Sequence, residues 1–115
     1  MKINVSNTIL YCNRWKETVN FYSIGLNLTV LTDREWFVEF QLTESARLSI
    51  ARADCSSIKS SEGKGLTISL QTDHIEAAYI CFQKKGLHPT PIHRVWDNKA
   101  FYLFDPEGNR IEFWA

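Results

Sequence analysis

The second half of the chain repeats, in the same order, a series of features found in the first half. Three short matches follow one another at nearly constant offsets. They pair Phe21, Gly25 and Leu26 with Phe82, Gly86 and Leu87 (offset 61), Phe37 and Phe40 with Phe101 and Phe104 (offset 64), and Arg47, Leu48 and Ser49 with Arg110, Ile111 and Glu112 (offset 63). Each match alone is at the level of chance, but their shared order indicates two modules with the same fold.

Hydrophobic periodicity predicts one element order in both modules: a strand, a helix and three more strands. In the first module the strands are predicted at residues 4–12, 28–32, 36–42 and 47–53, and the helix at 15–24. In the second module the strands are predicted at 66–72, 91–96, 100–104 and 110–114, the helix at 74–85 and a turn at 97–99. Gly25 and Gly86 end the two helices, a position that favours glycine.

The segment between the modules is polar and rich in serine, which is typical of a linker. A length of 115 residues suits one domain. We therefore predict a single domain over residues 1–115, with module 1 at about 1–53, the linker at about 54–65 and module 2 at about 66–115.

The charge balance excludes some classes of partner. The chain has 13 basic and 13 acidic residues, so it lacks the basic excess expected of a nucleic-acid-binding protein. No apolar run approaches the roughly 18 residues needed to cross a bilayer, and the first residues lack the apolar core of a signal peptide. We expect a cytoplasmic protein with no nucleic-acid or membrane partner. Four tryptophans in so short a chain indicate an aromatic-lined cavity or an interface.

The cysteines and the DPEGN turn have structural interpretations. Three cysteines form no recognisable disulfide framework. Cys12 and Cys81 are predicted to be small core residues, and Cys55 to be exposed. In the turn, Asp105 and Asn109 are expected to bond to the local backbone, with Gly108 at a positive φ.

Side chains alternate between the two faces of each predicted strand. One face is aliphatic and should pack on the helices. The other combines polar and aromatic residues, and it is either the wall of a binding cavity or a wet outer surface. Its members are Asn7, Tyr11, Ser49, Thr67, Gln71, Glu112 and Trp114.

The paired modules, the opening NTILYCNRWKETVNFY and the ending FYLFDPEGNRIEFW resemble the vicinal oxygen chelate superfamily. That superfamily includes glyoxalase I, bleomycin-resistance proteins, fosfomycin-resistance enzymes and extradiol dioxygenases. The resemblance covers essentially the whole chain. It implies an α+β fold in which paired βαβββ modules form a curved mixed sheet around a cavity.

In metal-dependent members of that superfamily, four strand residues bind one divalent metal. By resemblance the four positions here are Asn7, Ser49, Thr67 and Glu112. Only Glu112 has the expected ligand chemistry, because divalent metals favour several carboxylate or imidazole donors. The histidines His74, His88 and His93 occupy none of these positions. We therefore expect no metal ligands and no cofactor, with a weakly bound divalent metal as the alternative.

Three hypotheses for function follow. The first, which we favour, is metal-free binding of a small, partly aromatic or cationic ligand. The second is an enzyme of lyase, isomerase or dioxygenase type, in which Glu112 is the catalytic general base and a further electrophile such as Arg47, Arg94 or Tyr11 is needed. The predicted ligand-binding residues are Asn7, Tyr11, Trp36, Ser49, Thr67, Gln71, Trp96, Glu112 and Trp114.

The third hypothesis concerns assembly. Members of the superfamily commonly form homodimers, and some exchange modules between chains. The linker is long enough for such an exchange. Trp15 and Trp36 would then be buried between subunits, a role compatible with ligand binding elsewhere.

Overall fold

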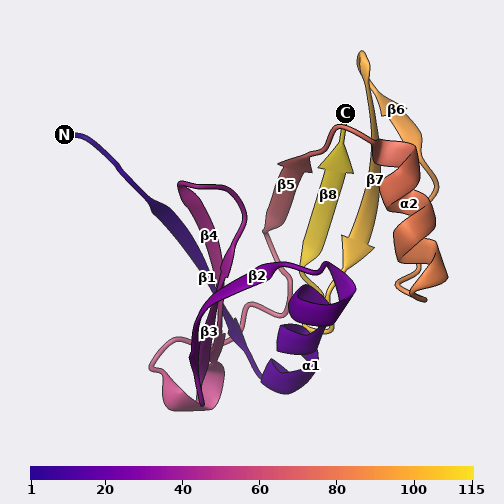
Figure 1. Ribbon diagram of the computed structural model, residues 1–115. Helices are drawn as coiled ribbons and strands as arrows, with labels where there is room; N and C mark the ends of the chain where they lie inside the picture. The colour runs from indigo at the N-terminus through magenta and orange to yellow at the C-terminus, as the bar shows by residue number, and fades with distance from the viewer. The chain divides into compact units, whose positions relative to one another are not determined.

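The computed structural model describes all 115 residues and divides them into two units, Met1–Glu62 and Gly63–Ala115. Each unit contains a strand, a helix and three more strands (Figure 1), as the sequence predicts. The chain is therefore α+β. None of its helices has the length and apolar character needed to cross a membrane.

The first unit begins with strand β1 and helix α1, which a π-helical segment extends to Gly25. Three further strands follow, and a short 3-10 helix comes after the last of them. The bounds are β1 Ser6–Cys12, α1 Trp15–Asn20, π-helix Phe21–Gly25, β2 Thr29–Arg34, β3 Phe37–Gln41, β4 Ala46–Arg52 and 3-10 helix Ala53–Cys55.

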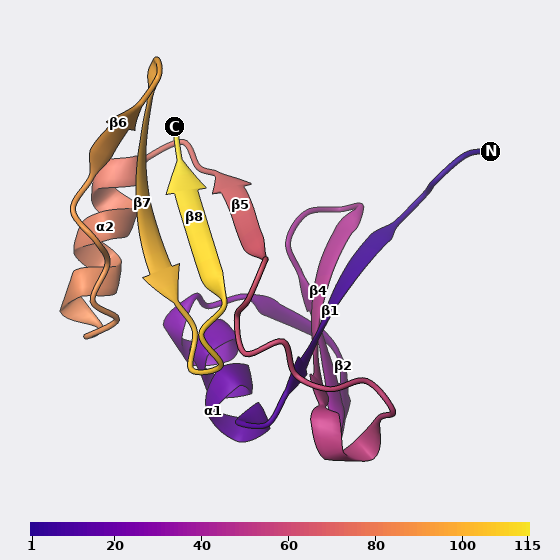
Figure 2. The same ribbon diagram turned by 180° about the vertical axis from the view of Figure 1, so that it is seen from behind.

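The second unit has the same order without the additional helical segments. Its helix α2 lies on one face of its sheet in both views (Figures 1 and 2). The bounds are β5 Thr67–Gln71, α2 Ile75–Lys84, β6 His93–Val95, β7 Asn98–Phe104 and β8 Arg110–Trp114.

Both sheets are mixed and have equivalent strand orders, β1-β4-β3-β2 and β5-β8-β7-β6. The first strand of each unit pairs in parallel with the last, and the remaining pairs are antiparallel. These pairings make β1 and β2, and likewise β5 and β6, run in the same direction at opposite edges of their sheets. The chain must cross over between such strands, and in each unit the helix after the first strand is part of that crossover.

The core of the second unit lies between its sheet and α2. Phe101 and Phe113 stack with ring centroids 5.3 Å apart, and Phe82 of α2 packs on Phe113 at 5.1 Å. In the first unit Tyr22 packs on Phe40, and the Trp15 indole N–H donates to the Ile50 carbonyl at 2.9 Å. The aliphatic face of each sheet is therefore the buried one, as alternation predicts.

The strand registers correct one of the predicted repeat matches. Glu39 pairs with Ser49, and Tyr102 pairs with Glu112, so the β3 and β7 positions correspond at an offset of 63. The predicted match of Phe40 with Phe104 is wrong by one residue. Phe40 is fully buried whereas Phe104 is 54% exposed, because a shift of one residue moves a strand side chain to the other face.

Three smaller predictions are also corrected. The regular α-helix ends at Asn20, because Leu26 N–H bonds to the Phe21 carbonyl five residues earlier and widens the last turn. The second hairpin turns at Trp96 and Asp97, and Asn98 already belongs to β7. Cys81 is exposed, because Ile75 and Phe82 define the buried side of α2 and Cys81 lies away from it.

The remaining local predictions are confirmed. Cys12 is buried and Cys55 is exposed. In the DPEGN turn the Asp105 carboxylate accepts hydrogen bonds from the backbone N–H groups of Glu107 and Asn109 and from the Asn109 side-chain amide, each at 2.9 Å. Gly108 has a φ of +94°.

Candidate functional site

The face of the second sheet opposite α2 carries Glu112 in a hollow of about 300 Å³. Each strand contributes alternate residues to this face, and the loop between β6 and β7 contributes the indole of Trp96. The hollow is lined by Ser69, Val95, Trp96, Asn98, Ala100, Glu112 and Trp114. Three predicted ligand-binding residues, Trp96, Glu112 and Trp114, therefore lie around one cavity.

The Glu112 carboxylate is oriented by a neighbouring strand but has no counter-charge. Its register neighbours are Ser69 on β5 and Tyr102 on β7. The Ser69 hydroxyl donates to the carboxylate at 2.6 Å. None of the four ion pairs in the chain includes Glu112. The negative charge is thus held in place and left available to a ligand.

A second hollow, of about 400 Å³, adjoins the β5 and β8 strands at the level of Thr67 and Arg110. Arg110 Nε donates to the Thr67 hydroxyl at 2.9 Å, and the guanidinium carbon lies 4.5 Å from the centroid of the Tyr102 ring. No carboxylate pairs with Arg110. The hollow is lined by Gly63, Gly65, Leu66, Thr67, Phe104, Gly108 and Arg110.

Sequence reasoning missed Arg110, Ser69 and Tyr102 as site residues. Arg110 lies two residues before Glu112 on the same strand, so the alternation that selected Glu112 also placed Arg110 on this face. The pairing of Ser69 with Glu112 needed the β5–β8 register, which a sequence alone does not provide.

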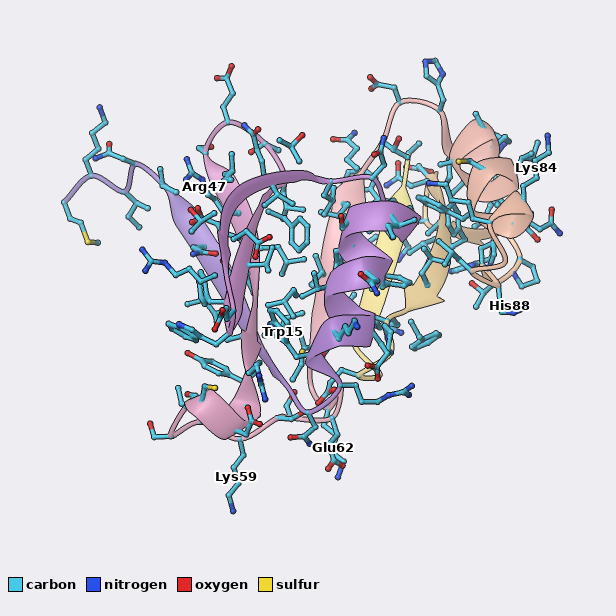
Figure 3. All side chains as sticks on the ribbon, turned by 60° about the horizontal axis from the view of Figure 1, so that its bottom comes forward. Trp15, Arg47, Lys59, Glu62, Lys84 and His88 are labelled. Carbon is cyan, nitrogen blue, oxygen red and sulfur yellow. The ribbon has the colours of Figure 1, made fainter.

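The polar face of the first sheet carries a different arrangement, a closed hydrogen-bond network. The Ser49 hydroxyl donates to the Asn7 side-chain carbonyl at 2.8 Å, and the Asn7 amide donates to Glu39 at 3.4 Å. Arg47, labelled in Figure 3, pairs with Glu39 at 3.7 Å, and its Nε is buried with no hydrogen-bond partner. Glu39 was missed, although the core positions of Val38 and Phe40 place it on this face.

The other predicted ligand-binding residues lie outside these two hollows. Tyr11 is on β1 opposite Ala51, and Gln71 is an exposed residue at the end of β5, paired with Trp114. Trp36 lies in the β2–β3 turn, where its ring packs against Phe37 at 5.3 Å. The structure therefore divides the predicted set among separate places in the two units.

The fold of the chain is shared with solved structures of low sequence identity. A glyoxalase/bleomycin resistance protein/dioxygenase from Nocardioides has a TM-score of 0.80 and 18% identity, over 100% of this chain and 84% of that one. A lactoylglutathione lyase from Agrobacterium tumefaciens has a TM-score of 0.78 and 17% identity, over 96% and 91%. The antibiotic binding protein TnmS3 from Streptomyces sp. CB03234 has a TM-score of 0.77 and 16% identity, over 95% and 92%.

Identities this low establish the fold and leave the ligand open. No curated protein matches the chain. A family model, described as the Glyoxalase/Bleomycin resistance protein/Dioxygenase superfamily, matches residues 4–113. Because that match spans nearly the whole sequence, including both repeated modules, the chain belongs to the glyoxalase/bleomycin resistance protein/dioxygenase superfamily.

Proposed function

We propose that this protein binds a small organic cation with an aromatic part in the hollow around Glu112. One observation carries the proposal: a carboxylate without a counter-charge lies in a cavity that Trp96 and Trp114 also line. A ligand ammonium would supply the missing positive charge, and its ring would pack on the indoles.

The magnitudes fit a binding site of moderate affinity. A hydrogen bond to a charged group contributes about 1.5–3 kcal/mol net. A cation over an indole face adds about 0.5–2 kcal/mol, depending on how far it is desolvated. Glu112 is only half-buried, so its contribution belongs at the lower end of the first range.

The residues at the metal-binding positions of the superfamily do not fit a divalent metal. The Thr67 hydroxyl oxygen already accepts a hydrogen bond from Arg110, so a positive charge is in direct contact with this position. The Asn7 carbonyl oxygen already accepts one from Ser49. No three His, Cys, Asp or Glu side chains gather anywhere in the chain. These contacts support binding that needs no metal.

An enzyme is the second candidate, and Arg110 is the observation that favours it. Arg110 and Glu112 lie on one face of β8, so a base and a positively charged electrophile adjoin the same sheet surface. Arg47 pairs with Glu39, and Arg94 alternates with the cavity-lining Val95, which places it on the opposite face. NMR spectroscopy of a bound compound would distinguish an enzyme from a binding protein, because only an enzyme would convert the compound to a new species.

Phenethylammonium is a suitable first probe for the binding site. We expect saturable binding by calorimetry, weakened about tenfold in Glu112→Gln, because the variant loses a charge-assisted hydrogen bond. Glu44→Gln removes the same charge from the exposed β3–β4 turn and should bind like the wild type. Equal affinity in Glu112→Gln and wild type would remove the proposed role of Glu112.

The same titrations test the metal. We expect equal affinity with and without EDTA, and no rise in Tm on adding Ni²⁺, Mn²⁺, Zn²⁺ or Fe²⁺. A stoichiometric metal that stabilises the fold would overturn metal-free binding and favour the enzyme.

We also propose that the protein forms a homodimer. Strand β1 is an edge of its sheet and exposes Ile9, and the segment before it exposes Ile3 and Val5. Exposed apolar residues along an unpaired sheet edge favour association with a second chain. Size-exclusion chromatography with light scattering tests this, since a mass that stays at 13.3 kDa at every concentration would exclude the dimer.

A further inference from the structure

The face that carries Glu112 also carries a positive charge without an ionic partner. Arg110 and Glu112 are two residues apart on β8, so their Cα atoms are about 7 Å apart and their side chains share one face. Neither residue forms an ion pair with the other or with any other residue of the chain. Two opposite charges therefore lie close together, and neither is neutralised.

Their neighbours explain why these two charges stay apart. Each side chain forms a hydrogen bond with a hydroxyl group of the neighbouring strand β5: Ser69 donates to Glu112 at 2.6 Å, and Arg110 donates to Thr67 at 2.9 Å. The Tyr102 ring, 4.5 Å from the guanidinium carbon, supports Arg110 from β7. These contacts leave the terminal nitrogens of Arg110 without a carboxylate.

In the first unit the equivalent arginine has a carboxylate partner. Arg47 occupies the position equivalent to Arg110, and it pairs with Glu39 on the neighbouring strand. At the position equivalent to Glu39 the second unit has Tyr102, and its carboxylate is instead on β8 as Glu112. One module thus neutralises its arginine internally, whereas the other leaves both charges open beside hollows.

We propose that the ligand of the second unit is dipolar, with an ammonium group for Glu112 and a carboxylate for Arg110. This inference rests on the proposed binding function and extends it by a second anchoring group. Two guanidinium nitrogens present a planar fork that matches the two oxygens of a carboxylate. The hollows that Glu112 and Arg110 line, of about 300 and 400 Å³, are lined by residues two positions apart on both β5 and β8, and they provide space for the two ends of such a molecule.

The spacing of the charges suggests the length of a suitable probe. Consecutive Cα atoms of a peptide are about 3.8 Å apart and each terminal group adds about 1.5 Å, so the charges of an extended dipeptide lie up to about 7 Å apart. Phenylalanylglycine has its ring at the ammonium end, which would place the ring near Trp114 of the Glu112 hollow. It is the probe that we would use.

The experiment measures the affinity of four forms of this dipeptide by calorimetry: the free dipeptide, its C-terminal amide, its N-acetyl derivative and the form blocked at both ends. We expect the free dipeptide to bind about tenfold more tightly than either singly blocked form, the factor that one charge-assisted hydrogen bond contributes. An amide that binds as tightly as the free dipeptide would overturn the dipolar ligand and leave the proposed function standing. Binding of none of the four would overturn the proposed function as well.

The variant Arg110→Gln tests whether Arg110 is the residue that recognises the carboxylate of the dipeptide. In Arg110→Gln the free dipeptide and its amide should bind equally, while the affinity of the amide should stay within twofold of the wild-type value. Arg94→Gln removes the same charge from the opposite face of β6, and it should keep the tenfold preference. A preference that persists in a folded Arg110→Gln would overturn the role of Arg110. If that variant does not fold, the four compounds on the wild-type protein decide the question alone.

Discussion

Replacing Gly63 by alanine tests a close backbone contact at the start of the second unit. A Cβ at this position would lie 2.1 Å from the carbonyl oxygen and 2.4 Å from the carbonyl carbon of Gly108. Both atoms belong to the backbone of the DPEGN turn, so neither can rotate away as a side chain would. Gly63 also has a φ of +80°, which is unfavourable for alanine. The substitution therefore meets two separate costs.

Gly65 provides the matched control, because it has only one of these costs. Its φ is +73°, but a methyl group at this position would have no neighbouring atom within 4 Å. The left-handed conformation costs about 1 kcal/mol for a residue with a Cβ. Overpacking adds about 1–3 kcal/mol. We expect Gly65→Ala to lower the free energy of unfolding by about 1 kcal/mol and Gly63→Ala by about 2–4 kcal/mol.

Urea denaturation followed by tryptophan fluorescence measures both variants. The midpoint should fall in each, and the slope m should stay constant if only the native state is affected. In a thermal scan the additional loss in Gly63→Ala corresponds to roughly 4 °C per kcal/mol for a chain of this size. If the two variants lost equal stability, the contact between Gly63 and Gly108 would not be tight, and the reasoning would be refuted.

Three further predictions concern other parts of the fold. Asp105 is 4% exposed, and Asp105→Ala removes the acceptor of three hydrogen bonds. We expect urea unfolding to show a free energy of unfolding lower by about 2–4 kcal/mol, with a smaller loss in Asp105→Asn. A change below about 0.5 kcal/mol in Asp105→Ala would contradict this. Trp96 has a φ of +54°, which glycine adopts more readily, and its side chain is 92% exposed. Trp96→Gly should therefore stabilise the fold by about 1 kcal/mol while weakening ligand binding. An equal gain in stability in Trp96→Ala would argue against relief of backbone strain as the cause. The hydrogen bond and the charge of Lys99, 3.0 Å away, lower the pKa of Glu76. Stability from this pair is therefore present above the unfolded-state pKa and is lost as the pH falls through the lowered folded-state pKa. NMR titration of Lys99→Gln should show the pKa of Glu76 closer to its ordinary value, and an unchanged pKa would refute the assignment.

Much of the fold could be predicted because its signals are local. Periodicity and turn residues located every strand and both helices, and the strict alternation in β8 separated Ile111 and Phe113 from Glu112 and Trp114. The repeat match was wrong where residues of the same type happened to recur at a different spacing. The match of Phe40 with Phe104 preserved the residue type, yet it was one position out of register and paired a buried residue with an exposed one.

The candidate site was predictable only in part, because partners across a sheet depend on register. Alternation placed Glu112 and Trp114 on the polar face, but the sequence did not show that Ser69 would hold the carboxylate. It also did not show that Glu39 would neutralise Arg47. Trp36 was chosen by residue type and Tyr11 by its place on the polar face of its strand, and neither lines one of the two hollows.

By itself the sequence determined the two βαβββ modules and the face that each strand residue occupies, because both follow from the spacing of residues along the chain. Only the tertiary structure decided which charges are neutralised. Arg47 and Arg110 begin equivalent strand segments, but one faces a carboxylate across the sheet and the other faces an aromatic ring. That difference is set by the residue at one position of the adjacent hairpin strand, Glu39 or Tyr102, and its place beside the arginine depends on the register of the hairpin.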